Sequence, residues 1–419
     1  MNKNFYCVWF SRFVSILGSS LTTFGVSVWV FGETGKATPM AITMLCSILP
    51  SVLFAPLSGM ICDYFNRKKV ILIADSIAAA TSLLLLLYLM TERFDFGIIC
   101  AFNFMNATAN MLDNNAYQAS LSTLVQEDDI KKAGGMNQII ESVSSIIAPV
   151  CAGILYYSVG LKGLLAIDLC TFIVAIIIFV RVPACLFSDS DKEEKEHENI
   201  FGNILAGFQF IFSARGLTLL MIFFAFFNFF LNVSDSLTEP LVLSLGNSFD
   251  MGLVKMAGGI GIFLGSLFIT GKGMKYSYSK SIFISAIVTG ASICVMGIRN
   301  NICFIILGEF VFLFVTPIVN TLAGTLWILK TPKELQGRVY AARSMVAKCI
   351  IPLSYLLVGP VADSWIPGFL QNYPNACKVI QIVLEDGNLN YRLVYVAAGM
   401  MAIIFAVLFF TQKELRQLD

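Results

Sequence analysis

Charged residues are scarce in this chain. Asp, Glu, Lys and Arg make up 13% of the 419 residues, whereas apolar residues make up 57%. A soluble globular domain carries about 25% charged and about 45–50% apolar residues. A water-soluble fold could not bury this much apolar surface, so we expect the chain to lie in a lipid bilayer. The formal net charge of +1 argues against nucleic acid as a partner, because no basic excess is available to neutralise phosphates.

Histidine and metal-binding cysteine patterns are also missing. The single histidine, His197, excludes a histidine proton relay, a His-based zinc site and a Ser–His–Asp triad. The 11 cysteines are scattered without a C-x-x-C spacing, which favours small buried side chains over disulfides. The glycine-rich stretch GGIGIFLG is a helix-packing pattern, not a nucleotide-binding loop. We therefore expect no enzyme activity, no metal and no cofactor.

Twelve apolar runs are long enough to cross a membrane. A bilayer core of about 30 Å needs about 20 apolar residues in a helix. The runs lie near residues 5–31, 40–61, 70–90, 96–121, 134–159, 163–180, 217–245, 251–270, 281–298, 302–329, 340–362 and 391–411. They predict an all-α integral membrane protein with 12 transmembrane helices in two six-helix bundles.

The distribution of basic residues predicts the orientation. If both termini are cytoplasmic, the inner loops hold most of the Lys and Arg residues, and the outer loops hold few, such as Arg299 and Arg392. Cytoplasmic loops are enriched in Lys and Arg, so this orientation is the expected one.

A polar stretch separates the two sets of six runs. It divides the chain into residues 1–181, a linker at residues 182–215, and residues 216–419. The linker begins with the charged segment SDSDKEEKEHEN and continues with apolar residues at helical spacing. The second part predicts an amphipathic helix on the cytoplasmic face.

The loop between the second and third runs contains a specific pattern, GMICDYFNRKKV. It resembles the signature loop of the major facilitator superfamily, G-x-x-x-D-[RY]-x-x-[RN]-[RK]-[RK], which implies that superfamily's fold. The resemblance also implies a conformational lock that closes the cytoplasmic side in one transport state. Its residues here are Gly59, Asp63, Arg67, Lys68 and Lys69, which can pair with acids such as Glu127, Asp128 and Asp129. When Pro149 is aligned with Pro352, Gly134 matches Gly337, so we add Gly337 and Arg338 to this lock.

More of the chain resembles the macrolide-efflux-like branch of drug exporters. The segments FSRFVSILGSSLTTFGVSVWVFGETGKAT, NQIIESVSSIIAPVCAGILYYSVG and LQGRVYAARSMVAKCIIPLSYLLVGPVAD carry this resemblance. The exporter motif G-P-x-x-G-G appears as residues 148–153, with Pro149 and Gly153 kept and alanine replacing one glycine of each pair. The fourth run also lacks the arginine of many proton-coupled members. Both departures argue against drug–proton antiport specifically, and neither argues against transport.

Charged side chains inside the runs are candidates for proton coupling or for the substrate cavity, because each costs about 2.5–3.5 kcal/mol at the bilayer centre. Arg12 and Asp113 match in depth and are expected to pair. Lys255 and Glu309 match in depth near the outer side. Further candidates are Asp235, Glu239, Glu141 and Lys348.

Three of these candidates have alternative interpretations. Asp235 and Glu239 lie four residues apart on one helix face, where they repel each other and could exchange protons. Alternatively, both are simply hydrated near the outer mouth. Glu141 is the preferred buried carboxylate for coupling, with a structural salt bridge or a surface position as the alternatives.

Two polar or aromatic clusters complete the pattern. The run FFAFFNFF at residues 223–230 could contact lipid, pack internally, or line a substrate wall. The asparagines of the fourth run should face the cavity or neighbouring helices, because an unpaired amide in lipid is costly. They are Asn103, Asn106, Asn110, Asn114 and Asn115.

These observations favour a secondary transporter. The resemblance implies proton-driven export of hydrophobic or cationic small molecules from a bacterial inner membrane by a monomer. A uniporter or importer of a metabolite is the alternative within transport. A membrane enzyme or receptor-like protein lacks any supporting residue set.

Overall fold

The computed structural model describes residues 3–126, 129–183, 187, 200–271, 277–332, 335–385 and 387–416, and no strand occurs among them. The helices are α1 (Lys3–Thr34), α2 (Ala37–Leu53), α3 (Ala55–Tyr64), α4 (Arg67–Leu89), α5 (Phe96–Leu124), α6 (Ile130–Val180), α7 (Ile200–Ser213), α8 (Arg215–Leu245), α9 (Ser248–Gly271), α10 (Tyr278–Ile298), α11 (Ile302–Lys330), α12 (Gln336–Pro360), a π-helical turn (Val361–Trp365), α13 (Ile366–Asn372), α14 (Pro374–Leu384), α15 (Leu389–Phe410) and α16 (Lys413–Arg416).

Nine helices within these ranges are long and apolar enough to cross a membrane. Two of the runs that we predict as separate are joined in α6, whose 51 residues continue through Gly160. At Gly160 the backbone has φ 66° and ψ −172°, a conformation that glycine adopts readily, so the helix consists of two arms. The predicted run 40–61 is divided instead, into α2 and α3, at Phe54. The all-helical membrane architecture is therefore as predicted.

Short polar side chains begin several of these helices. Asn66 Oδ1 accepts a hydrogen bond from the Lys68 amide at 3.0 Å, and Asp95 Oδ1 accepts one from the Gly97 amide at 2.8 Å. Asn301 caps α11 in the same way. Such side chains satisfy amides that have no partner inside the helix, which fixes where each helix begins.

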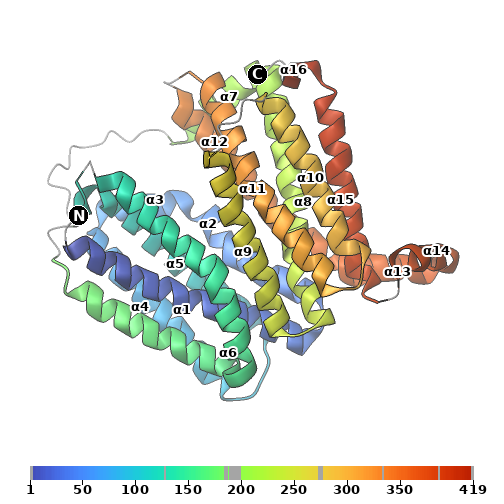
Figure 1. Cartoon of the computed structure of the whole chain (residues 1–419). Coiled ribbons are helices and arrows are strands. Elements are labelled where there is room, and N and C mark those ends of the chain that lie inside the picture. Colours follow the sequence, from blue (N-terminus) through green and yellow to red (C-terminus); the bar gives the residue numbers. More distant parts are fainter. Residues whose placement is uncertain are drawn as a thin grey trace. The chain divides into compact units, whose positions relative to one another are not determined.

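The chain forms two compact units. Unit 1 comprises Met1–Gly35, Pro39–Glu193 and Ser248–Gly252. In it α1 packs along α6, and α4 packs against both α5 and α6 (Figure 1). Gly18 allows the close approach of α1 to α6, because a Cβ atom there would lie 2.0 Å from Thr171 Oγ1.

Unit 2 comprises Lys36–Thr38, Glu194–Asn247 and Leu253–Asp419. In it α10 packs against α11 and α15, and α8 packs against α12 and α15 (Figure 1). Helix α9 approaches α11 through glycines, since a Cβ at Gly261 would lie 2.5 Å from the Phe310 oxygen and one at Gly265 would lie 2.0 Å from the Phe314 oxygen. This contact confirms the packing interpretation of the glycine-rich stretch.

Helix α7 coincides with the second part of the predicted linker, for which the sequence predicts an amphipathic helix. It belongs to unit 2 and packs against α12 and α8. A Cβ at Gly207 would lie 2.3 Å from the Arg338 carbonyl oxygen, so α7 and α12 are in backbone contact there.

Arg392, which the sequence places in an outer loop, is 0% exposed. Its guanidinium donates to the carbonyl oxygens of Gly297 at 3.1 Å, Ile298 at 2.6 Å and Gly387 at 3.1 Å, and also to those of Leu384 and Glu385. Arg392 therefore holds the end of α10 to the segment before α15.

Candidate functional site

The expected pair of Arg12 and Asp113 forms in unit 1. Arg12 Nη1 on α1 lies 2.6 Å from Asp113 Oδ2 on α5, and Arg12 Nη2 donates to Asn114 Oδ1 at 2.7 Å. The guanidinium carbon lies 4.2 Å from the centre of the Tyr117 ring, at cation–π distance. Arg12 is thus fixed by three neighbouring side chains of one helix.

A small cavity in unit 1 adjoins this pair. Its lining includes Arg12, Asp113 and a second carboxylate, Asp75 on α4, which is 9% exposed. The candidates chosen from the sequence omit Asp75, although a carboxylate that interrupts the apolar run 70–90 is a signal in itself. The cavity therefore places one cation beside two acids.

In unit 2 three carboxylates gather around Lys255. Lys255 Nζ on α9 lies 3.4 Å from Asp235 Oδ1 and 3.9 Å from Glu239 Oε1, both on α8. Asp235 and Glu239 share one helix face, as their spacing predicts. Glu309 on α11 also interacts electrostatically with Lys255, which agrees with the expected match in depth. We call these four residues the Lys255 cluster.

Burial distinguishes the members of the Lys255 cluster. Glu239 is 8% exposed and Glu309 is 1% exposed, whereas the Asp235 side chain is 45% exposed. The interpretation of Glu239 as a simply hydrated residue is therefore wrong. Neither carboxylate oxygen of Glu309 has a hydrogen-bond partner among the residues that the structure describes.

Hydrogen-bonded side chains stand close to the Lys255 cluster. The Tyr395 hydroxyl on α15 donates to the Ser234 carbonyl oxygen at 2.8 Å and lies 2.9 Å from Thr238 Oγ1. Tyr395 interacts electrostatically with both Glu309 and Asp235. The cluster thus lies among α8, α9, α11 and α15 of one unit.

The basic residues of the predicted lock bind helix ends in unit 1. Arg67 Nη1 donates to the Ala119 carbonyl oxygen at 2.9 Å. Lys68 Nζ donates to the carbonyl oxygens of Val180 at 2.9 Å and Val182 at 2.6 Å. A cation at the C-terminal end of a helix is favoured by the helix dipole, so Lys68 stabilises the end of α6. Lys69 is exposed, and so are Gly337 and Arg338 at the start of α12.

Several predicted site residues fall outside what the structure describes. Glu127 and Asp128 lie outside the described residues. Gly59, Asp63, Glu141 and Lys348 lie within helices, but their side chains are outside the described part. The roles that we predict for these residues stay predictions.

The exporter-like motif lies in the first arm of α6. Pro149 is inside the helix, and a Cβ at Gly153 would lie 2.5 Å from the Ser248 carbonyl oxygen. Ser248 Oγ donates to the Gly153 carbonyl oxygen at 3.1 Å, and a Cβ at Gly252 would lie 2.9 Å from the Pro149 oxygen. The motif therefore provides a backbone-to-backbone contact with Ser248–Gly252, the first turn of α9, which belongs to unit 1.

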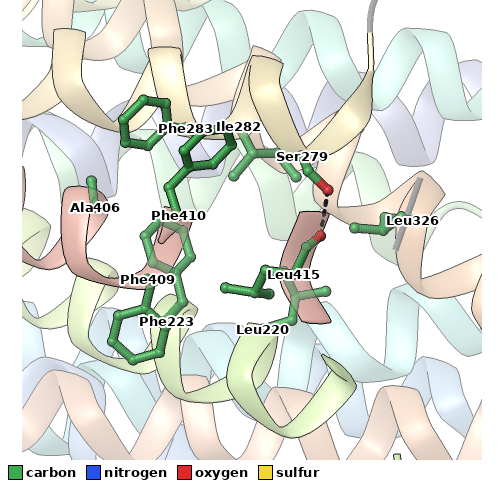
Figure 2. Close-up of a pocket in the computed structure, with 10 residues that line it drawn as sticks. All are labelled: Leu220, Phe223, Ser279, Ile282, Phe283, Leu326, Ala406, Phe409, Phe410 and Leu415. Atoms are coloured by element: carbon green, nitrogen blue, oxygen red, sulfur yellow. Dashed lines mark hydrogen bonds between the residues drawn. The ribbon is translucent and has the colours of Figure 1, made fainter. Parts of the chain in front are cut away.

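Phe223, the first residue of the aromatic run, helps to line an apolar pocket in unit 2. Phe223 lies beside Phe409, with ring centres 5.8 Å apart, and Phe283 stacks on Phe410, with ring centres 4.0 Å apart (Figure 2). Ser279 Oγ, the polar side-chain group among the labelled residues, donates to the Leu415 carbonyl oxygen at 2.8 Å. Phe223, Phe227 and Phe230 are buried, whereas Phe226 is exposed. Internal packing thus accounts for the buried members of this run.

Three of the five asparagines of α5 contact neighbouring helices, as expected. Asn114 accepts from Arg12 on α1, and Asn115 Nδ2 donates to Ser58 Oγ on α3 at 2.6 Å. Asn103 is buried and lies 3.4 Å from Ser47 Oγ on α2. Asn110 instead donates to Asn106 within α5 at 2.7 Å.

A family model for the Major Facilitator Superfamily matches residues 8–354. The chain belongs to this superfamily. It is therefore a multi-pass membrane transporter and not an enzyme, and the resemblance seen in the loop at residues 59–70 is confirmed.

Curated relatives include exporters. Macrolide efflux protein A of Streptococcus pyogenes is 23% identical over 372 residues, which cover 86% of this chain and 89% of that protein. Macrolide efflux protein A of Enterococcus faecalis is 23% identical over 332 residues, covering 76% of this chain and 99% of that protein. The multidrug efflux pump Tap of Mycolicibacterium fortuitum is 20% identical, covering 85% of this chain and 88% of that protein.

Solved structures share the fold. The nucleoside transporter NupG superposes with a TM-score of 0.69 at 13% identity, covering 98% of this chain and 99% of that one. A bacterial homologue of the iron transporter ferroportin, in an inward-facing state, superposes with a TM-score of 0.71 at 11% identity and the same coverage. At these identities the likeness concerns the fold alone.

Proposed function

We propose that this chain is a secondary transporter that exports hydrophobic or cationic small molecules, including macrolide-like compounds, by alternating access driven by the proton gradient. The relatives named for macrolide efflux support the direction and the substrate class, because they align over most of both chains. We further propose 12 membrane spans with both termini cytoplasmic, obtained when the two arms of α6 count as two spans and α2 with α3 as one. The location would be the plasma membrane of a bacterium, and the working unit a monomer.

The Lys255 cluster supports the proton-coupling part of the proposal. With every group ionised, three carboxylates and one ammonium would leave an excess of negative charge in a segment that crosses lipid. Excess charge at such depth is costly. Glu309 is 1% exposed, and its oxygens have no hydrogen-bond partner within the described ranges. We infer that Glu309 takes up and releases the coupling proton while Lys255 moves between the two acids of α8.

The cavity beside Arg12 supports the substrate part. Arg12, Asp113 and Asp75 place fixed charges next to an internal space on α1, α4 and α5. A cationic substrate could compete with Arg12 for the carboxylates. Glu141 and Asp63 keep the coupling and lock roles that the sequence predicts.

The test is export of ethidium and of a fluorescent macrolide from cells. Wild type is compared with Glu309→Gln and with Glu92→Gln, an exposed carboxylate outside the predicted spans that serves as the control. The proposal predicts that Glu309→Gln loses gradient-driven export at normal membrane abundance, whereas the control exports like wild type.

Two results would count against the proposal. Unimpaired export by Glu309→Gln would remove the proton assignment. If neither compound leaves the wild-type cells at any pH, the exporter assignment fails, and transport of a metabolite by the same fold becomes the better account.

A further inference from the structure

The chain between α12 and α15 forms an arm of two short helices in unit 2. The arm consists of Trp365, α13 and α14, residues 365–384, and we call it the α13–α14 arm. In Figure 1 it extends sideways from the ends of α10 and α15 instead of continuing along them. Helix α13 contacts α15, and α14 contacts both α10 and α15. The arm is therefore attached to the ends of helices that cross the membrane, but it runs in another direction.

The length of the apolar helix that leads into the arm exceeds the thickness of a bilayer. This apolar helical stretch, Gln336–Asn372, contains 37 residues. At a rise of about 1.5 Å per residue it is about 55 Å long, whereas the hydrocarbon core is about 30 Å thick. The core cannot hold the whole stretch, so part of it lies among the lipid headgroups.

Arg392 indicates which part that is. Its guanidinium donates to the carbonyl oxygen of Ile298, the last residue of α10, and to that of Gly387, just before α15. It also donates to the carbonyl oxygen of Leu384, the last residue of α14. The ends of α10 and α15 mark the edge of the hydrocarbon core, so the arm is held at that edge. The α13 end of the long stretch is therefore the part at the headgroups.

The exposed surface of the arm is aromatic and almost without charge. Trp365, Phe369 and Tyr373 are 65%, 47% and 59% exposed, and their spacing of four places them on roughly one helix face. The ring centres of Phe369 and Tyr373 lie 5.1 Å apart. Lys378 is the one charged residue among residues 365–384, whereas about 25% of the residues of a soluble domain are charged. A contiguous exposed apolar patch of this kind marks a contact surface.

Two features indicate that lipid is the partner of this surface. Tryptophan and tyrosine are enriched where a membrane meets water, because each ring joins an apolar body to a polar group. The patch also continues the exposed apolar surface of α12, where Leu353 and Leu357 face outward from a membrane-crossing helix. One lipid surface can therefore cover both the side of α12 and the aromatic face of the arm.

We propose that the α13–α14 arm lies along the phospholipid surface of the membrane, with the rings of Trp365, Phe369 and Tyr373 inserted among the headgroups. The contact is apolar, so it requires no particular headgroup charge. It holds the adjoining ends of α12 and α15 at the membrane surface. The inference goes beyond the proposed function, since it requires only that the chain spans a membrane and involves neither a drug nor a proton gradient.

The test is tryptophan fluorescence of the purified full-length protein in phosphatidylcholine vesicles. The difference between the emission of wild type and that of Trp365→Phe is the emission of Trp365. Three quenchers are compared: phospholipid brominated near the headgroup end of its acyl chains, phospholipid brominated near the chain ends, and acrylamide in the water. We expect the shallow bromines to quench Trp365 at least twofold more strongly than the deep bromines, and acrylamide to quench it weakly.

A matched control reports a ring in water. Arg93 is exposed in the loop between α4 and α5, beside the charged residues Glu92 and Asp95. Arg93→Trp in the Trp365→Phe background should be quenched strongly by acrylamide and not by either brominated lipid. Vesicles that contain phosphatidylglycerol should leave the quenching of Trp365 unchanged, because the proposed contact does not depend on headgroup charge.

A second measurement perturbs the contact itself. Phe369→Asp places a charge among the inserted rings and should speed the hydrogen exchange of the α13 amides in vesicles at least tenfold. Gln371→Asp adds the same charge at an exposed polar position of the same helix and should leave the exchange unchanged. Equal exchange in the two variants would contradict the proposal.

The fluorescence results that would overturn the proposal are distinct from one another. Strong quenching of Trp365 by acrylamide, without quenching by lipid, would place the arm in water. Protection from acrylamide and from both lipids would show that a second copy of this chain or another protein covers the rings. Quenching mainly by the deep bromines would place the arm inside the hydrocarbon core. None of these results depends on drug export, so failure here and failure of the exporter proposal are separable.

Discussion

Replacing Gly153 by alanine tests the packing of the exporter-like motif. The added Cβ would lie 2.5 Å from the Ser248 carbonyl oxygen and 3.2 Å from its carbonyl carbon. Both atoms are backbone, so neither can rotate away as a side chain would. The first turn of α9, Ser248–Gly252, must shift, and the hydrogen bond from Ser248 Oγ to the Gly153 oxygen is weakened.

The size of the effect follows from two opposing contributions. Alanine is more favourable than glycine inside a helix by about 0.5–1 kcal/mol. Overpacking a tight contact costs about 1–3 kcal/mol. Gly135 lies in the same arm of α6, and a Cβ there meets no atom within 4 Å. Gly135→Ala should therefore stabilise the protein by about 0.5–1 kcal/mol, while Gly153→Ala should be less stable than Gly135→Ala by about 1–3 kcal/mol.

The assay is denaturant unfolding in detergent, with both variants measured beside wild type and with drug export measured in parallel. Opposite shifts of the two unfolding midpoints, with loss of export in Gly153→Ala alone, are the expected result. If the two substitutions shift the midpoint equally and in the same direction, the contact with Ser248 does not exist as described.

Three further substitutions test the charged contacts. Arg392→Leu removes the donor to five carbonyl groups and should lower the free energy of unfolding by at least about 3 kcal/mol; a loss below 1 kcal/mol would contradict its burial. Arg12→Gln and Asp113→Asn should each cost about 3–5 kcal/mol, and the double variant clearly less than their sum, whereas strict additivity would show that the pair does not form. Lys68→Met removes the ammonium group that binds the carbonyl oxygens at the end of α6 and should lower the free energy of unfolding by about 1–3 kcal/mol. In the same unfolding assay, Lys69→Met should stay near wild type.

Much of the fold could be predicted because lipid imposes simple rules. A helix that crosses the bilayer must be long and apolar, so the runs in the sequence predict where the helices lie. The pairing of Arg12 with Asp113 could be predicted as well, because the rise per residue fixes the depth of a side chain. The contact between the glycines of α9 and the helix α11 follows from small residues at helical spacing.

Other features depend on tertiary contacts that cannot be read from the amino-acid sequence. The junction at Gly160 requires a positive φ, and glycine permits many conformations, so the sequence cannot show which one occurs. Arg392 is next to a predicted helix start and resembles a loop cation, but its partners are carbonyl groups of the distant end of α10 and of the nearby segment before α15. Asp75 and Asp168 interrupt apolar runs, yet only the structure shows what surrounds them.

The central claim is proton-driven export, and one reconstitution tests it most directly. The purified protein is placed in liposomes, a pH gradient that is acidic inside is imposed, and accumulation of a radiolabelled macrolide is followed with and without a protonophore. The account predicts accumulation that depends on the gradient, collapses when the protonophore is added, and is absent in Glu309→Gln. Accumulation that ignores the gradient, or that persists in Glu309→Gln, would contradict it.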